Sequence, residues 1–235
     1  MSPFLGEFIG TMLLIIMGDG VVANVVLNKT KGNNSGWIVI TFGWAMAVFL
    51  GVYASTKLGG DGHLNPAVTI AMAAFTDFKM SLLPTYIAAQ FTGAIAGAVI
   101  VWVAYKQHFD ETPDGDTKLA VFCTGPAIRS TFYNLATEVI GTFILVFGAM
   151  AMSKPDSSLG TLNALPVGLL VFGIGLSLGG PTGYAINPAR DLGPRIAHFI
   201  LPIKNKRNSD WGYSWIPVIG PIMGGLLAVY LFNLI

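Results

Sequence analysis

The chain contains 235 residues, of which 53% are hydrophobic and only 11% are charged, and its net charge is +1. Soluble domains carry roughly 25% charged residues, so this composition indicates a chain built for lipid. The near-neutral charge gives no basic surface, so we expect no nucleic acid partner. The single cysteine, Cys123, excludes an intramolecular disulfide, and its position in a polar loop predicts an exposed thiol. The three histidines are widely spaced, and we expect neither a metal site nor another cofactor.

Six apolar runs are long enough to cross a membrane, because about 20 helical residues span a hydrocarbon core of roughly 30 Å. In chain order they cover residues 4–27, 37–56, 82–105, 132–152, 162–178 and 215–234. Two further apolar segments, 66–75 and 188–198, are too short to span, and each follows a glycine-rich break. Their length fits re-entrant segments or buried helices.

The two halves of the chain repeat one pattern. Glu7 and Glu138 each precede a Gly-Thr pair by three residues, and an Asn-Pro-Ala motif follows each glutamate at a similar distance. Each half therefore contains two spans, a half-segment and a third span. Three spans are an odd number, so the second half enters from the opposite side, which predicts inverted repeats with broken helices near the midplane. We expect one transmembrane domain over 1–235, with repeats of about 1–106 and 130–235 joined by an aqueous loop at 107–129.

The two motifs, Asn65, Pro66, Ala67 and Asn187, Pro188, Ala189, begin the two half-segments. Asparagine is a strong N-cap and proline suits the first helical position, so each motif predicts a helix start. If the asparagine oxygens cap the helices, the side-chain NH2 groups remain as donors that point into the path between them. Two facing helix N-termini also place about half a positive charge each at one spot. Such a spot accepts neutral hydroxyl oxygens and repels protons and cations, which predicts a path for small neutral solutes.

The paired motifs with the following arginine resemble those of the aquaporin family, specifically the bacterial glycerol facilitators, or aquaglyceroporins. The resemblance covers essentially the whole chain. It implies an all-α membrane protein with six transmembrane helices and two re-entrant half-helices in an inverted repeat. It also implies a homotetramer with one pore per subunit, located in the cell membrane.

The resemblance further implies a four-residue selectivity filter, which falls on Trp44, Gly175, Tyr184 and Arg190. Gly175 stands where strict water channels have a histidine, so we expect it to leave room that histidine would fill. Trp44 and Tyr184 would form an apolar corner for the carbon backbone of a polyol, while Arg190 donates to its hydroxyls. Tyr184 departs from the phenylalanine that is usual at this position.

Four other polar residues have expected supporting roles. Glu7 and Glu138 have no second carboxylate, histidine or serine grouped with them in the sequence, so bracing of the re-entrant loops through backbone N–H groups is favoured over catalysis. His63 is expected to line or brace the inner vestibule. Asp191 is expected to form a loop ion pair with Arg195.

These features predict a passive channel for glycerol, water and other small uncharged solutes that excludes ions and protons. Further candidate solutes are dihydroxyacetone, urea, lactic acid and hydrogen peroxide. The alternative is a water-selective channel with little glycerol flux, against which Gly175 argues. An enzyme would need a nucleophile–base pair or clustered acids in the spans, and a coupled transporter would need titratable groups at the midplane, where this chain has amides. A purely structural membrane protein would need neither Arg190 nor the paired asparagines.

Overall fold

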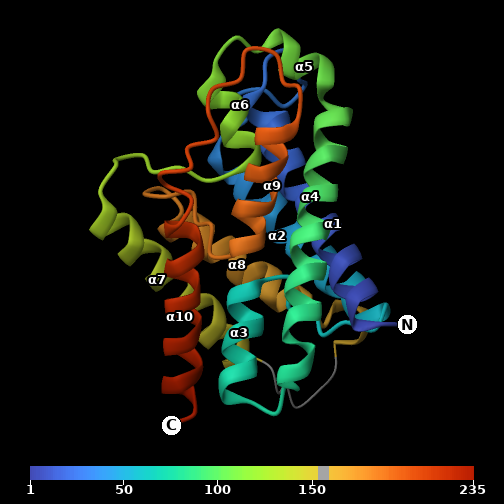
Figure 1. Ribbon diagram of the computed structural model, residues 1–235, viewed down its shortest axis with the longest axis vertical. Coiled ribbons are helices and arrows are strands. Elements are labelled where there is room, and N and C mark those ends of the chain that lie inside the picture. The colour runs from blue at the N-terminus through green and yellow to red at the C-terminus, as the bar shows by residue number, and fades with distance from the viewer. Residues whose placement is uncertain (153–158) are drawn as a thin grey trace.

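The computed structural model describes residues 1–152 and 159–235, and these residues form a bundle of helices along the long axis of the molecule (Figure 1). The longer helices are α1 (Pro3–Val26), α2 (Trp37–Lys57), α4 (Leu83–Ala104), α7 (Thr131–Ala151), α8 (Leu165–Leu178) and α10 (Ile216–Phe232). Two shorter helices, α3 (Pro66–Phe75) and α9 (Pro188–Ile200), occupy the predicted half-segments. In Figure 1, α9 lies in the upper half of the bundle and α3 in the lower half.

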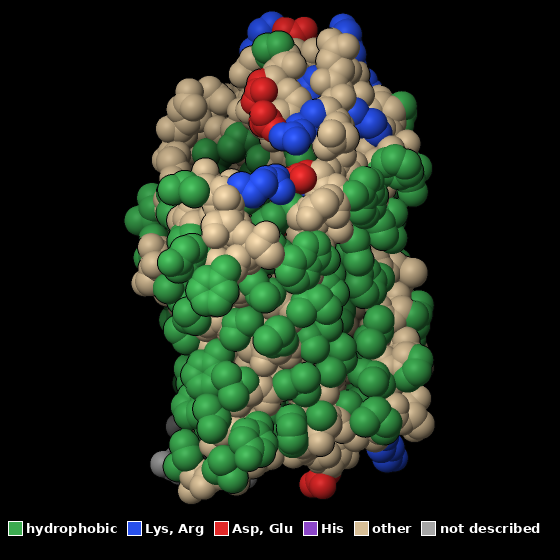
Figure 2. Space-filling view, turned by 60° about the vertical axis from the view of Figure 1, so that its left-hand side comes forward, with side chains coloured by type: hydrophobic (Ala, Val, Ile, Leu, Met, Phe, Trp, Pro, Cys, Tyr) green, Lys and Arg blue, Asp and Glu red, His purple; other side chains and the backbone are tan. Residues whose placement is uncertain are grey.

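Most helix ends lie close to the ends of the predicted spans. Among the described residues, α1, α2, α7 and the segment Met80–Ala104 are long and apolar enough to cross a membrane. The helices α8 and α10 are shorter, with 14 and 17 residues. The start of α8 is delayed relative to the apolar run because a 3-10 turn, Gly160–Leu162, precedes it. The side of the molecule seen in Figure 2 is hydrophobic over its middle and lower parts, with most charged side chains gathered near the top.

The packing pattern of the first half recurs in the second. Helix α1 packs against α2 and α4, and α7 packs in the same way against α8 and α10. Each half-helix crosses to the other half, because α3 packs on α10 and α9 packs on α4. The two half-helices also contact each other, and α2 contacts α8. The half-helices thus lie inside a ring of longer helices that is shared between the halves.

Glycines permit the closest helix contacts, and they do so at equivalent places. A Cβ added to Gly93 on α4 would collide with the carbonyl oxygen of Phe8 on α1. A Cβ added to Gly224 on α10 would collide with the carbonyl oxygen of Val139 on α7. Small residues at such positions let helix backbones approach closely in membrane bundles.

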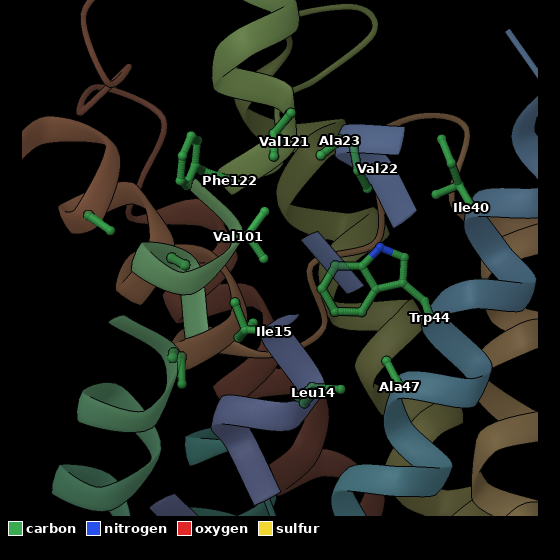
Figure 3. Packing of buried hydrophobic residues seen from close by; sticks show 14 of the residues in the cluster. Leu14, Ile15, Val22, Ala23, Ile40, Trp44, Ala47, Val101, Val121 and Phe122 are labelled. Atoms are coloured by element: carbon green, nitrogen blue, oxygen red, sulfur yellow. The ribbon is translucent and has the colours of Figure 1, made fainter. Parts of the chain in front are cut away.

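The interior between α1, α2, α4 and α6 is apolar (Figure 3). The Trp44 ring lies between α1 and α2, close to Leu14 and Val22. Val101 and Phe122 close the same cluster from α4 and α6. This packing fixes one wall of the cavity described below.

The segment 107–129, predicted as an aqueous loop, contains two short helices, α5 (Lys106–Glu111) and α6 (Gly115–Phe122). Asp114 caps α6 by accepting from the backbone N–H of Thr117 at 2.9 Å. The expectation that Cys123 is exposed is wrong. Its side chain is 3% exposed because α6 folds back onto α1 and α9, and this burial raises the pKa of the thiol.

Candidate functional site

The two Asn-Pro-Ala motifs cap the two half-helices in the same way. The Asn65 side-chain oxygen accepts from the backbone N–H of Ala67 at 2.9 Å. The Asn187 oxygen accepts from the N–H groups of Ala189 and Arg190, at 3.0 and 3.2 Å. These bonds use N–H groups that have no partner within a helix, and the following prolines lack the N–H altogether.

The side-chain amides also cross-link the two halves. The Asn65 NH2 donates to the carbonyl oxygen of Ile186, and the Asn187 NH2 donates to that of Leu64, both at 2.8 Å. The expectation that these NH2 groups point only into the path therefore needs refinement. Each NH2 carries two hydrogens, so one fastens the opposite loop while the other remains available as a donor.

The residues that precede the motifs have left-handed backbones. Leu64 and Ile186, at equivalent places in the two halves, have φ angles of +50° and +45°, and Tyr184 has a φ of +39°. Such conformations cost a non-glycine residue about 1–2 kcal/mol, so the surrounding structure must hold them.

Two buried glutamates hold the strained loops. Glu7 on α1 accepts from the backbone N–H groups of His63 and Leu64, at 3.0 and 2.7 Å, and from Gln90 on α4 at 2.8 Å. Ser55 on α2 supplies a further donor to the same carboxylate.

Glu138 on α7 does the same in the second half. Its carboxylate accepts from the N–H groups of Ala185 and Ile186, at 3.0 and 2.8 Å, and from the Thr182 hydroxyl at 2.7 Å. Both carboxylates are fully buried. Since all these bonds go to loops and neighbouring helices, the arrangement braces the loops and presents no free acid for catalysis.

A cavity of about 510 Å³ runs past the two asparagine caps. It begins near His63 and Thr76 and ends against Trp44, Tyr184 and Arg190. Aliphatic side chains, among them Leu14, Val48, Val52, Val68, Val171 and Leu145, form much of its wall. The cavity therefore has an apolar face and a small number of polar groups.

His63 lies at one end of this cavity. Its Nδ1 atom is 3.1 Å from the Thr69 hydroxyl, and its ring contacts those of Phe78 and Tyr86. Tyr86 in turn donates to Asp61 at 2.6 Å. The ring is thus fixed at the cavity wall by neighbours on α3 and α4.

Three of the four predicted filter residues meet at the other end. The guanidinium carbon of Arg190 lies 4.0 Å from the centre of the Trp44 ring, which is a cation–π distance. Tyr184 lines the cavity beside them. Sequence reasoning did not include Asp19 on α1, whose carboxylate lies 3.7 Å from Arg190 Nη1.

Gly175, the fourth predicted filter residue, sits against Tyr184. A Cβ added to Gly175 would lie 2.8 Å from Tyr184 Cζ and 2.9 Å from Thr41 Cγ2. The Gly175 carbonyl accepts from Trp37 Nε1 at 3.0 Å, and Trp37 meets the Tyr184 ring edge-on. The room that we expected beside Gly175 is therefore occupied by the end of the tyrosine ring.

The family model for the major intrinsic proteins matches residues 1–232 of the chain. The chain belongs to the major intrinsic protein family. A protein of Thermotoga maritima named "Probable glycerol uptake facilitator protein" is 59% identical over 99% of each chain. The "Glycerol uptake facilitator protein 3" of Lactiplantibacillus plantarum is 54% identical over 98% of this chain and 95% of the relative. The solved structure of the aquaglyceroporin from Plasmodium falciparum matches with a TM-score of 0.86 and 30% identity, covering 99% of this chain and 98% of that one.

This major intrinsic protein has the aquaporin-like fold predicted from its sequence, and it is a multi-pass membrane protein. Its ion pair between Asp191 and Arg195 lies within α9 and is fully buried, whereas the sequence suggested a loop pair. Asp191 also accepts from the N–H and hydroxyl of Thr124, both at 2.7 Å. Within the described residues, no three His, Cys, Asp or Glu side chains gather closely enough to hold a metal ion.

Proposed function

We propose that this protein is a passive channel through which glycerol, water and other small uncharged solutes diffuse across the cell membrane. The main support for this proposal is the cavity of about 510 Å³, which passes both asparagine caps and ends against Arg190 and the rings of Trp44 and Tyr184. The names of the relatives support the choice of glycerol. Dihydroxyacetone, urea, hydrogen peroxide and the protonated form of lactic acid remain candidate solutes, since they are similarly small and uncharged.

The cavity wall suits a polyol that moves along it. The carbon chain of glycerol contacts the aliphatic face and the rings of Trp44 and Tyr184. Its hydroxyls accept from the free hydrogens of Asn65 and Asn187 and from Arg190. The N-termini of α3 and α9, which face each other at these asparagines, oppose the entry of cations and protons.

The family and the geometry argue for a channel rather than an enzyme or a coupled transporter. The groups at the crossing of the half-helices are amides, which do not titrate, and the two glutamates beside them are committed to the loops. Within the bilayer we propose a homotetramer with one cavity per subunit, on the strength of the family resemblance. Exposed large apolar side chains along the bundle are consistent with subunit or lipid contacts.

Reconstitution into liposomes tests the channel directly. Stopped-flow light scattering follows vesicle shrinkage and re-swelling after an osmotic step made with glycerol, and a step made with sorbitol serves as the impermeant reference. We expect glycerol re-entry much faster than in protein-free vesicles. Fast shrinkage without faster glycerol re-entry would instead establish the water-selective alternative.

A further inference from the structure

Asp19 is an acidic residue inside the membrane-spanning helix α1. Its side chain is fully buried, and within the described residues neither carboxylate oxygen has a hydrogen-bond partner. An ionisable group at such a place is expensive, and such residues are retained where they pair with another charge or serve transport. The supporting glutamates, Glu7 and Glu138, have several donors each, so Asp19 differs from them in kind.

The partner of Asp19 is the cavity arginine. Asp19 Oδ1 lies 3.7 Å from Arg190 Nη1, which is itself buried and has no hydrogen bond within the described residues. The other carboxylate near this arginine, Asp191, is bonded to Arg195 and Thr124. Among the described side chains, Asp19 is therefore the carboxylate within ion-pair distance of Arg190.

The neighbouring residue of Asp19 shapes the same contact. Gly18 has no side chain, and a Cβ placed there would collide with the six-membered ring of Trp44. The indole consequently lies directly against α1 (Figure 3), and the guanidinium group of Arg190 lies over the indole. Two consecutive residues of α1 therefore act on the same site. Gly18 makes room for the Trp44 ring, and Asp19 faces the charge of Arg190.

We propose that Asp19 is a positioning and specificity-determining residue of this channel. Its carboxylate draws Nη1 of Arg190 toward α1 and compensates the positive charge at this end of the cavity. Arg190 then offers its remaining N–H groups to neutral hydroxyls without attracting small anions. This inference rests on the proposed function, because it assigns a role in solute selection at the same site.

The test compares purified wild type with Asp19→Asn, Asp19→Glu and a matched control, Asp110→Asn, in proteoliposomes. Asp110 pairs with Lys106 within α5, away from the cavity lining. Three quantities are measured: water permeability, glycerol permeability, and the inhibition of tracer glycerol exchange by sodium lactate at pH 7.5, where lactate is an anion. If Asp19→Asn does not insert, Asp19→Ser, which is smaller and also neutral, takes its place.

We expect the neutral variants to become sensitive to lactate, with half-inhibition at a concentration about tenfold lower than in wild type, because Arg190 is no longer compensated. The ratio of glycerol to water permeability should fall in the same variants, whereas Asp19→Glu and Asp110→Asn should behave as wild type. Unchanged lactate sensitivity and an unchanged ratio in the neutral variants would overturn the inference. So would a parallel loss of water and glycerol flux in Asp19→Asn and Asp19→Glu, because that outcome shows a purely structural role. A wild type without glycerol flux would reject the proposed function itself, which is a separate result.

Discussion

Tyr184 and Gly175 are in close contact beside the end of the cavity that Arg190 lines. The tyrosine ring ends where a side chain on residue 175 would begin, and Trp37 packs edge-on against that ring. Because residue 175 has no side chain, the Tyr184 ring can occupy this space. A side chain added at residue 175 would therefore have to move the Tyr184 ring, which lines the cavity.

Replacement of Gly175 by alanine should displace the Tyr184 ring toward the cavity. We expect glycerol permeability to fall several-fold. Water permeability should fall less, because a water molecule is smaller and can pass through a narrower opening. The matched control is Gly173→Ala on the same helix, where an added Cβ meets nothing within 4 Å. Both permeabilities are measured in proteoliposomes, and an equal loss of glycerol flux in the two variants would contradict the assignment.

Single residues also show where sequence reasoning stops. The asparagine caps were predictable because capping is local, but their bonds to Leu64 and Ile186 join residues more than 120 positions apart. The crowding of Gly175 by Tyr184 likewise depends on two segments that meet only in the folded chain. The sequence alone could have identified Asp19, because an acidic residue inside an apolar span is a functional candidate by default.

The re-entrant loops depend on the elements behind them. Each loop contains a left-handed residue next to its asparagine, and each is held by one carboxylate from the first helix of its own half. The strained backbone and the buried charge therefore stabilise each other. Neither would persist alone in a membrane interior.

Replacement of Glu138 by glutamine should weaken this arrangement, because an NH2 group replaces one of the two accepting oxygens. Hydrogen bonds to charged groups contribute about 1.5–3 kcal/mol each, so we expect a loss of that order in stability and a lower melting temperature in detergent. Glu111→Gln, at an exposed glutamate on α5, is the control and should leave the melting temperature unchanged. Equal melting temperatures for the two variants would show that Glu138 does not brace its loop.

The glycine contacts between helices lead to a second prediction at this scale. Gly224→Ala should push α10 away from α7, since the new methyl group would meet the Val139 carbonyl and lie 3.0 Å from the Phe143 nitrogen. Overpacking of this kind typically costs about 1–3 kcal/mol. Gly20→Ala on α1, where the added Cβ meets nothing within 4 Å, should be neutral. Thermal unfolding in detergent distinguishes the two, and a destabilised Gly20→Ala variant would indicate a general intolerance of helix substitutions instead.

Elements with strong local signals were predicted well. The starts of α3 and α9 follow from the Asn-Pro pairs, and the ends of α1, α2 and α7 fall within about two residues of the apolar runs. The short helices α5 and α6 were missed because α5 is short and polar, and α6 is stabilised by packing against α1, α9 and the segment around Arg207, while α5 packs on α4. The burial of Cys123 was missed for the same reason.

At the scale of the whole molecule, one buried arginine connects the bundle to two segments at the end where most charged side chains gather (Figure 2). Arg195 on α9 donates to the Thr124 carbonyl oxygen at 2.9 Å and to the Ser209 carbonyl oxygen at 2.7 Å. Thr124 belongs to the segment between the two halves, and Ser209 to the segment before α10. Through Asp191 the same network reaches the first turn of the half-helix that carries Arg190.

A double-mutant cycle measures how strongly this connection supports the fold. Arg195→Met leaves the buried Asp191 carboxylate without its counter-charge, and removal of one partner of a buried ion pair typically costs about 3–5 kcal/mol. The double variant Asp191→Leu, Arg195→Met should be less destabilised than the sum of the single variants, because it leaves no unpaired charge. The partly exposed pair Lys106–Asp110, which has the same spacing within a helix, is the control, and its coupling energy should be about 0–1 kcal/mol. Melting temperatures in detergent give the comparison, and a coupling at Asp191–Arg195 as small as that of the control pair would show that the segments at Thr124 and Ser209 fold independently of the half-helix.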